Sequence, residues 1–276
     1  MFGALAKENS LKNIVFSPSS MRTSLVLAYL GSEGTTEKEL KQTLSLEGAD
    51  KSEVAKGFAQ LLAKGQSPQG AQFSYANRIY VAKKFGLVQF YQELFGKYFN
   101  APAEKVNFED RAKVAQEINS WVEEKIHHQI KNLISSSSLD SDTVTLLINA
   151  IYFNANWREE KGEGGHHVSA ECTDIVFLII LPLEEQGLAE LEEKLSGVAL
   201  NEISSQLQEE LVELKLPTFK MEFDVSLVSV LEQLGLKQMF SENANFKSLV
   251  LEDMYISEVM HKAFIDLNEE GTTAAM

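Results

Sequence analysis

The feature that most constrains the fold is the run TVTLLINAIYF at residues 143–153, which is apolar almost throughout and rich in residues that favour β-structure. Such a run is typical of a central strand that is covered on both faces. A second strand is predicted over residues 73–81, where Asn77 alone interrupts an apolar face. Residues 255–267 predict a further strand, with His261 on its apolar face. A large β-sheet is therefore expected.

Helical and strand patterns are interspersed along the rest of the chain. They do not alternate as regular β-α-β units, and neither an internal repeat nor a low-complexity linker divides the 276 residues. This organisation favours one mixed α+β domain built around the sheet. The further elements predicted are helices at residues 51–64, 111–133 and 227–234, and strands at residues 175–181 and 211–223, the last with a bend at Pro217.

The composition excludes some classes of partner. There are 25 Lys and Arg residues against 40 Asp and Glu residues, so the net charge of -15 repels nucleic-acid phosphates and anionic membrane surfaces. No apolar run approaches the roughly 18 residues of a membrane span, and the first residues do not form a signal peptide. The single cysteine, Cys172, excludes an internal disulfide. We expect no nucleic-acid or membrane partner.

Catalytic motifs are missing from the sequence. It contains no G-x-S-x-G, H-E-x-x-H, P-loop or dinucleotide-binding pattern, so an enzyme is not expected. His166, His167 and Cys172 are capable of binding metal but lack the spaced pairs of structural zinc sites, and no metal or cofactor is predicted. His261, taken alone, is more often a hydrogen-bonded core residue than a catalytic base.

Six segments form a collinear pattern over most of the chain. Together they resemble the serpins, a family of serine protease inhibitors. The resemblance implies an α+β, serpin-like fold with one large mixed sheet and about eight helices around it. The segments are NIVFSPSS, AYLGSEGTTEKEL, INAIYFNANW, LIILP with GLAELEEKL, LKLPTFKMEFDVSLVSVLEQLGLKQMF, and ISEVMHKAFIDLNEEGTTAA.

The resemblance implies roles for particular residues at the middle and top of the main sheet. Ser17, Ser20, Asn149 and His261 match the hydrogen-bonded cluster, called the shutter, beneath the place where the central strands part. This match supplies the hydrogen-bond partner that a buried His261 needs. Trp157 matches the tryptophan of the breach, at the top of that sheet, where loop insertion begins.

The end of the chain resembles the hinge that precedes the reactive loop of inhibitory serpins. A strand that slides between two others needs small side chains, and no charge or proline follows Gly271. Lys220 is placed to reach the hinge carboxylate of Glu269. The residues that match the hinge are Glu269, Glu270, Gly271, Thr272, Thr273, Ala274 and Ala275.

The family resemblance implies an inhibitor that acts as a suicide substrate. A trypsin-like or chymotrypsin-like serine protease attacks the loop and forms an acyl-enzyme, and the cleaved loop then enters the main sheet as a new strand. The protease is distorted before it can deacylate, and the relaxation of a metastable native state drives the process. The family also suggests an extracellular location, with the cytoplasm as the alternative because no signal peptide is seen.

The chain departs from the family pattern at two places. It stops at Met276, just beyond the hinge, and residues 158–174 stand where the family has several dozen residues of the two smaller sheets. We therefore expect a single domain over residues 1–276, truncated at the hinge, with both smaller sheets incomplete. An incomplete or splice form of an inhibitor is the first interpretation, favoured by the hinge. A non-inhibitory serpin-like binding protein, or an inactive fragment, is the alternative, favoured by the truncation.

Overall fold

The fold is taken from a computed structural model of the chain. It describes residues 1–65, 71–99, 102–140, 142–162, 165–170, 177–195, 197–198, 202–203, 206–208, 215–268 and 271–275. The helices there are α1 (Phe2–Glu8), α2 (Pro18–Gly31), α3 (Gly34–Thr43), α4 (Lys51–Gly65), α5 (Gln89–Phe99), α6 (Arg111–Lys125), α7 (Leu188–Leu195) and α9 (Val228–Gln233), with 3₁₀ turns η1 (Ser136–Ser138) and η2 (Gln238–Phe240). The strands are β1 (Ala71–Ala82), β2 (Glu104–Val106), β3 (Thr145–Gly162), β4 (Gly165–Ala170), β5 (Phe219–Ser226), β6 (Glu258–Leu267) and β7 (Gly271–Ala275).

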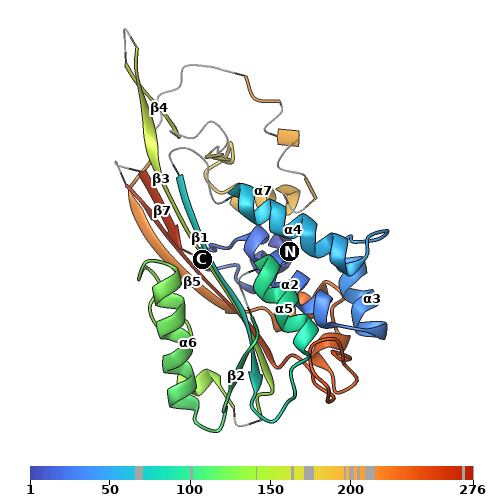
Figure 1. Cartoon of the computed structure of the whole chain (residues 1–276). Helices are drawn as coiled ribbons and strands as arrows, with labels where there is room; N and C mark the ends of the chain where they lie inside the picture. Colours follow the sequence, from blue (N-terminus) through green and yellow to red (C-terminus); the bar gives the residue numbers. More distant parts are fainter. Residues whose placement is uncertain are drawn as a thin grey trace.

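One mixed sheet organises these elements, with the strand order β2-β1-β3-β7-β6-β5 (Figure 1). Helix α2 packs against β1 and β3, and α6 packs against β1 from the other side of the sheet (Figure 1). The predicted α+β class and large mixed sheet are thus confirmed, with eight α-helices in the described part of the chain. The central strand β3 is covered on both faces where the apolar run predicted it.

The last strand, β7, lies between β3 and β6 and pairs with five residues of β3 and four of β6. Its residues pair antiparallel with β3 from Gly271 opposite Asn156 to Ala275 opposite Tyr152. On its other side, β7 pairs with β6. Below β7, β3 and β6 pair directly in parallel, with Asn149 opposite His261. We call the point where β7 ends the fork, formed by residues 149–152 of β3 and 261–264 of β6.

Local sequence explains how α2 reaches the sheet. Its N-cap is Ser17, whose hydroxyl accepts a hydrogen bond from the Ser20 N–H at 3.2 Å, and Pro18 occupies the first turn. A serine cap and an N-terminal proline both favour a helix start at this position. The helix is buried along most of its length, which accounts for its largely apolar sequence after Ser24.

Helix α6 is shorter than the sequence predicts. The apolar stripe indicated a helix over residues 111–133, but the helix ends at Lys125, and His127 and His128 adopt left-handed backbone conformations. Ile126 and Ile130 remain buried beyond the helix. They are buried because the chain continues across the sheet, so their periodic spacing did not require a helix.

Two predicted strands differ from the structure. In the strand predicted at 175–181, residues 175–176 lie outside the described residues, and residues 177–181 have no strand structure. An extended apolar segment needs neighbouring strands to pair its backbone, and the described residues provide none for it. The strand predicted at 211–223 begins only at Phe219, after Pro217, and residues 209–214 lie outside the described part.

Strand β3 continues past the sheet into a hairpin with β4, in which Glu160 pairs with His167. This hairpin occupies the region where the smaller sheets were expected to be incomplete (Figure 1).

Candidate functional site

Four predicted residues meet under the central strands, on the α2 face of the sheet. Asn149 donates from Nδ2 to the Ser20 carbonyl at 2.9 Å and accepts at Oδ1 from His261 Nδ1 at 3.3 Å. The backbone N–H of Ser17 donates to His261 Nε2 at 3.4 Å. Three of these side chains are almost inaccessible: Ser20 and His261 are 0% exposed and Asn149 is 1% exposed. The structure therefore brings together all four residues predicted for the shutter.

The hydrogen bonds around His261 define its protonation state. Nε2 accepts and Nδ1 donates, which is the pattern of a neutral imidazole with its hydrogen on Nδ1. Burial lowers the pKa of His261 to about 4, because the charged form would lose its hydration. A second proton at Nε2 would also face the Ser17 N–H. His261 is thus a neutral structural link between β6 and the start of α2.

Asn77 is a member of this cluster that sequence reasoning missed. It lies on β1 directly opposite Asn149 and accepts a hydrogen bond from Asn149 Nδ2. The side chain is 7% exposed. The signal was present, because an amide that interrupts an apolar strand face needs a buried partner. With Asn77 included, the cluster joins three strands, β1, β3 and β6, to helix α2.

The predicted hinge is the other half of the candidate site. Residues 271–275 form β7, while Glu269 and Glu270 lie outside the described residues. Thr272 pairs with Ala155 on one side and Leu267 on the other, and it is 7% exposed. Its hydroxyl has no hydrogen-bond partner. The hinge sequence therefore occupies an internal strand position, with a buried polar atom left unsatisfied.

Replacing Thr272 by valine is expected to stabilise the protein. On folding, the Thr272 hydroxyl loses its hydrogen bonds to water and gains no partner in the protein. Removing this hydroxyl should therefore raise the free energy of unfolding by about 1 kcal/mol. A thermal melt should show this as a shift of about 2–4 °C. Thr23→Val is the matched control, because the buried Thr23 hydroxyl donates to the Ser19 carbonyl at 3.0 Å and its loss should destabilise. A lower melting temperature for Thr272→Val would contradict the buried position of Thr272.

Trp157 and Lys220 both lie at the end of the sheet where β7 begins. The backbone of Trp157 follows Asn156, the residue opposite Gly271, so its position adjoins the point where β7 enters the sheet; its side chain lies outside the described part. Lys220 Nζ pairs with Asp266 at 2.6 Å, directly across the β5–β6 ladder. The pairing expected with Glu269 falls on a residue that is not described.

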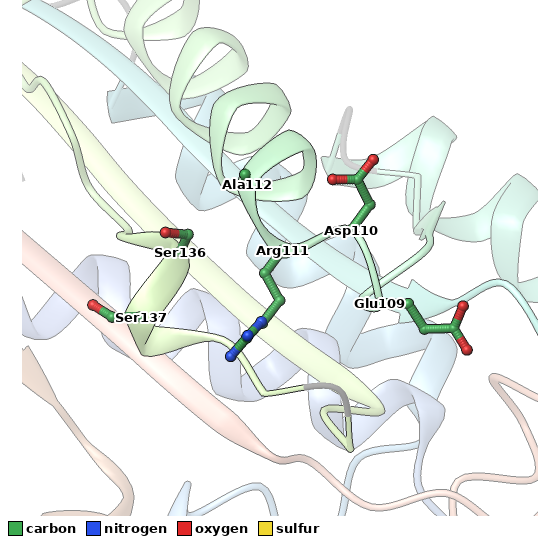
Figure 2. A pocket seen from close by; sticks show the side chains of 6 residues that line it. All are labelled: Glu109, Asp110, Arg111, Ala112, Ser136 and Ser137. Carbon is green, nitrogen blue, oxygen red and sulfur yellow. The ribbon is translucent and has the colours of Figure 1, made fainter.

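An open hollow of about 490 Å³ at the start of α6 is lined by Glu109, Asp110, Arg111, Ala112, Ser136 and Ser137 (Figure 2). Among the described residues, no group of three acidic, histidine or cysteine side chains could hold a metal ion. Within those residues, too, no helix is long and apolar enough to cross a membrane.

Comparisons with known proteins agree with the geometry of the sheet. The family model described as Serpin (serine protease inhibitor) matches residues 1–162 and 170–276. The chain is 32% identical over 316 aligned residues to Serine protease inhibitor 42Dd of Drosophila melanogaster, covering 100% of this chain and 83% of that protein.

Solved structures extend the comparison to three dimensions. The structure of cleaved Serpin 42Da superposes with a TM-score of 0.85 at 33% identity, over 99% of this chain and 85% of that one. Reactive loop cleaved human thyroxine-binding globulin has the same fold, with a TM-score of 0.83 at 22% identity over 98% of this chain and 91% of that one. A family match over almost the whole chain and relatives above 30% identity carry the assignment: this chain belongs to the serpin family.

Proposed function

We propose that this protein inhibits serine-type endopeptidases as a suicide substrate, by inserting its hinge and reactive loop into the main sheet. The observation that carries the proposal is β7: residues 271–275 lie as a strand between β3 and β6. An inserted strand gains ladder hydrogen bonds on both sides, and a strand with glycine at 271 and alanine at 274 and 275 has little bulk to place between paired strands.

In the proposed mechanism the protease carries out the covalent chemistry, and this chain supplies the loop and the sheet into which the loop inserts. The attacking serine of a trypsin-like or chymotrypsin-like protease forms an ester with the loop, and strand insertion then moves the protease before water can cleave that ester. The driving force is the relaxation of a metastable fold. The shutter cluster of Ser17, Ser20, Asn77, Asn149 and His261 is proposed to control where the strands part, because its hydrogen bonds connect both sides of the fork.

A covalent-complex assay tests this function. The 276-residue chain, and any form that the transcript encodes beyond the codon for Met276, are mixed with trypsin-like and chymotrypsin-like proteases. We expect an SDS-stable complex with at least one protease. Thr272→Arg should convert the inhibitor into a substrate, because a guanidinium at this buried position opposes insertion. Cleavage without a complex, in every form tested, would contradict inhibition.

The alternative is a non-inhibitory binding function. One observation favours it: thyroxine-binding globulin, named for a ligand, shares this fold. The same assay separates the two, since a binding protein should form no covalent complex and should respond little to Thr272→Arg. An extracellular location is part of our proposal by family resemblance, and fractionation of expressing cells and medium tests it.

A further inference from the structure

Four consecutive serines, at residues 135–138, form an exposed turn beside α6. We call these four residues the serine turn. The residue before it, Ile134, and the residue after it, Leu139, are both buried. Because the chain is fixed to the core on either side, the serine turn is held at the surface, and all four serines are exposed. The proposed inhibition uses none of their hydroxyl groups.

The serine turn is closed by weak interactions at the surface. The Ser138 N–H donates to the Ser135 carbonyl at 3.1 Å and to Ser135 Oγ at 3.2 Å. Ser137 Oγ lies 2.7 Å from Ser135 Oγ. A short 3₁₀ turn has poor hydrogen-bond geometry, and water replaces exposed hydrogen bonds at little cost. Local opening of the turn is therefore easy, and it gives an enzyme access to the serine hydroxyls.

Acidic residues follow the serine turn. Asp140 stands three residues after Ser137 and Asp142 stands five residues after it, and both are exposed. Lysine and arginine are absent from residues 132–157. This charge pattern is complementary to a serine kinase whose substrate groove is lined with basic side chains. Among the four serines, Ser137 is the one with a carboxylate at the third following position.

Arg111 is placed to receive a phosphate carried by the serine turn. Arg111 Nη1 lies 3.5 Å from the Leu139 carbonyl, and Arg111 and Ser137 line the same hollow. Figure 2 shows the Arg111 side chain on the side of the serine turn, while Asp110 and Glu109 point away from it. A guanidinium group donates two parallel hydrogen bonds to a phosphate. Arg111 is also the first residue of α6, where the helix dipole favours negative charge.

We propose that Ser137 is a phosphorylation site for a serine kinase of this acid-directed class, and that its phosphate pairs with Arg111. Ser137 Oγ forms a bond to the γ-phosphorus of a nucleoside triphosphate, while the bond from that phosphorus to the β–γ bridging oxygen breaks. The nucleoside diphosphate leaves, and the hydroxyl proton passes to a carboxylate of the kinase. The phosphate adds a charge of about -1.5 to -2 at pH 7 and joins the serine turn to the first turn of α6. This modification goes beyond the proposed inhibition and does not depend on it.

Phosphorylation of the folded 276-residue chain with ATP and Mg²⁺ tests the site. One sample receives an acid-directed serine kinase, and a second receives a kinase that requires basic residues before the serine. Fragmentation of the tryptic peptide of residues 132–158 locates the phosphate. We expect phosphate on Ser137 with the first kinase alone, and none in Ser137→Ala.

Two further variants test the recognition of Ser137. Asp140→Asn should slow the transfer about tenfold, because a charge that attracts the kinase is lost. Ser136→Ala is the matched control and should leave the site and the rate unchanged, since the third residue after Ser136 is the apolar Leu139. Absence of phosphate at Ser137, or an undiminished rate in Asp140→Asn, would overturn the proposed site.

Amide hydrogen exchange tests the pairing with Arg111. Phosphorylation should slow exchange of residues 114–118 about fivefold, because the new ion pair opposes opening of the first turn of α6. Arg111→Gln should accept the phosphate but lose this protection. Lys113→Gln is the matched control, because this lysine lies in the same turn, pairs with Glu117 and is not among the residues that line the hollow. Equal protection in Arg111→Gln and Lys113→Gln would overturn the pairing. Phosphate at Ser137 in a chain that forms no protease complex would refute the proposed inhibition and keep the modification site.

Discussion

Asn149→Ala is expected to lower the free energy of unfolding by about 3 kcal/mol. The change leaves the Ser20 carbonyl, the Asn77 amide oxygen and the His261 Nδ1–H without the partner that each has now. These groups are buried, so most of their desolvation cost is uncompensated. Urea denaturation should show the loss, and the melting temperature should fall by roughly 6–12 °C.

Asn9→Ala is the control for this prediction. Asn9 Nδ2 donates to the Leu5 carbonyl at 3.0 Å in a part-buried setting near the surface. Its loss should cost less than about 1 kcal/mol, because water can replace the missing partner. If Asn149→Ala were no more destabilising than Asn9→Ala, the cluster would not hold the strands together.

Acidification is expected to remove about 3 kcal/mol of stability through His261 alone. Its pKa falls from 6.5 to about 4 on folding, because burial disfavours the imidazolium. Between these pH values the unfolded chain binds a proton that the folded chain does not. Stability from this residue is therefore complete above pH 6.5, declines as the pH falls toward 4, and reaches its full loss below that value.

Unfolding curves at several pH values measure this effect as the difference in free energy of unfolding between the wild type and His261→Asn. The carboxylates titrate in both the wild type and His261→Asn, so the slope that only the wild type shows between pH 6.5 and 4 belongs to His261. We expect a shallower slope of stability against pH in His261→Asn than in the wild type. Parallel slopes would mean that His261 is charged, or hydrated, in the folded protein.

Much of the sheet could be predicted from the sequence, because its strands have distinctive patterns. The run that forms β3 is apolar at successive positions, so both faces of the strand are apolar, as expected of a central strand in a sheet covered on both sides. The spacing of His261 on β6 placed it on the core face, where the structure has it. The pairing of His261 with Asn149 came only through the family resemblance, since the two residues are 112 positions apart and no local pattern joins them.

The sequence predicted neither the end of α6 at Lys125 nor the lack of strand structure at residues 177–181, for separate physical reasons. Ile126 and Ile130 fit a helical stripe, but they are buried in the segment that follows α6, where His127 and His128 have left-handed backbone conformations. The segment at 175–181 has strand-forming residues, yet strand structure depends on neighbours that supply hydrogen bonds. Both the end of a helix and the formation of a strand depend here on contacts with distant parts of the chain, and the local spacing of apolar residues does not reveal those contacts.

Amide exchange of residues 271–275 tests the central claim most directly, because insertion of the hinge between β3 and β6 should protect its backbone N–H groups on both sides. Exchange of these amides at least about a hundredfold slower than in an unstructured peptide, and comparable to that of β6, is the predicted result. Exchange at the rate of a free chain end would show that the hinge lies outside the sheet and would contradict the internal position of β7.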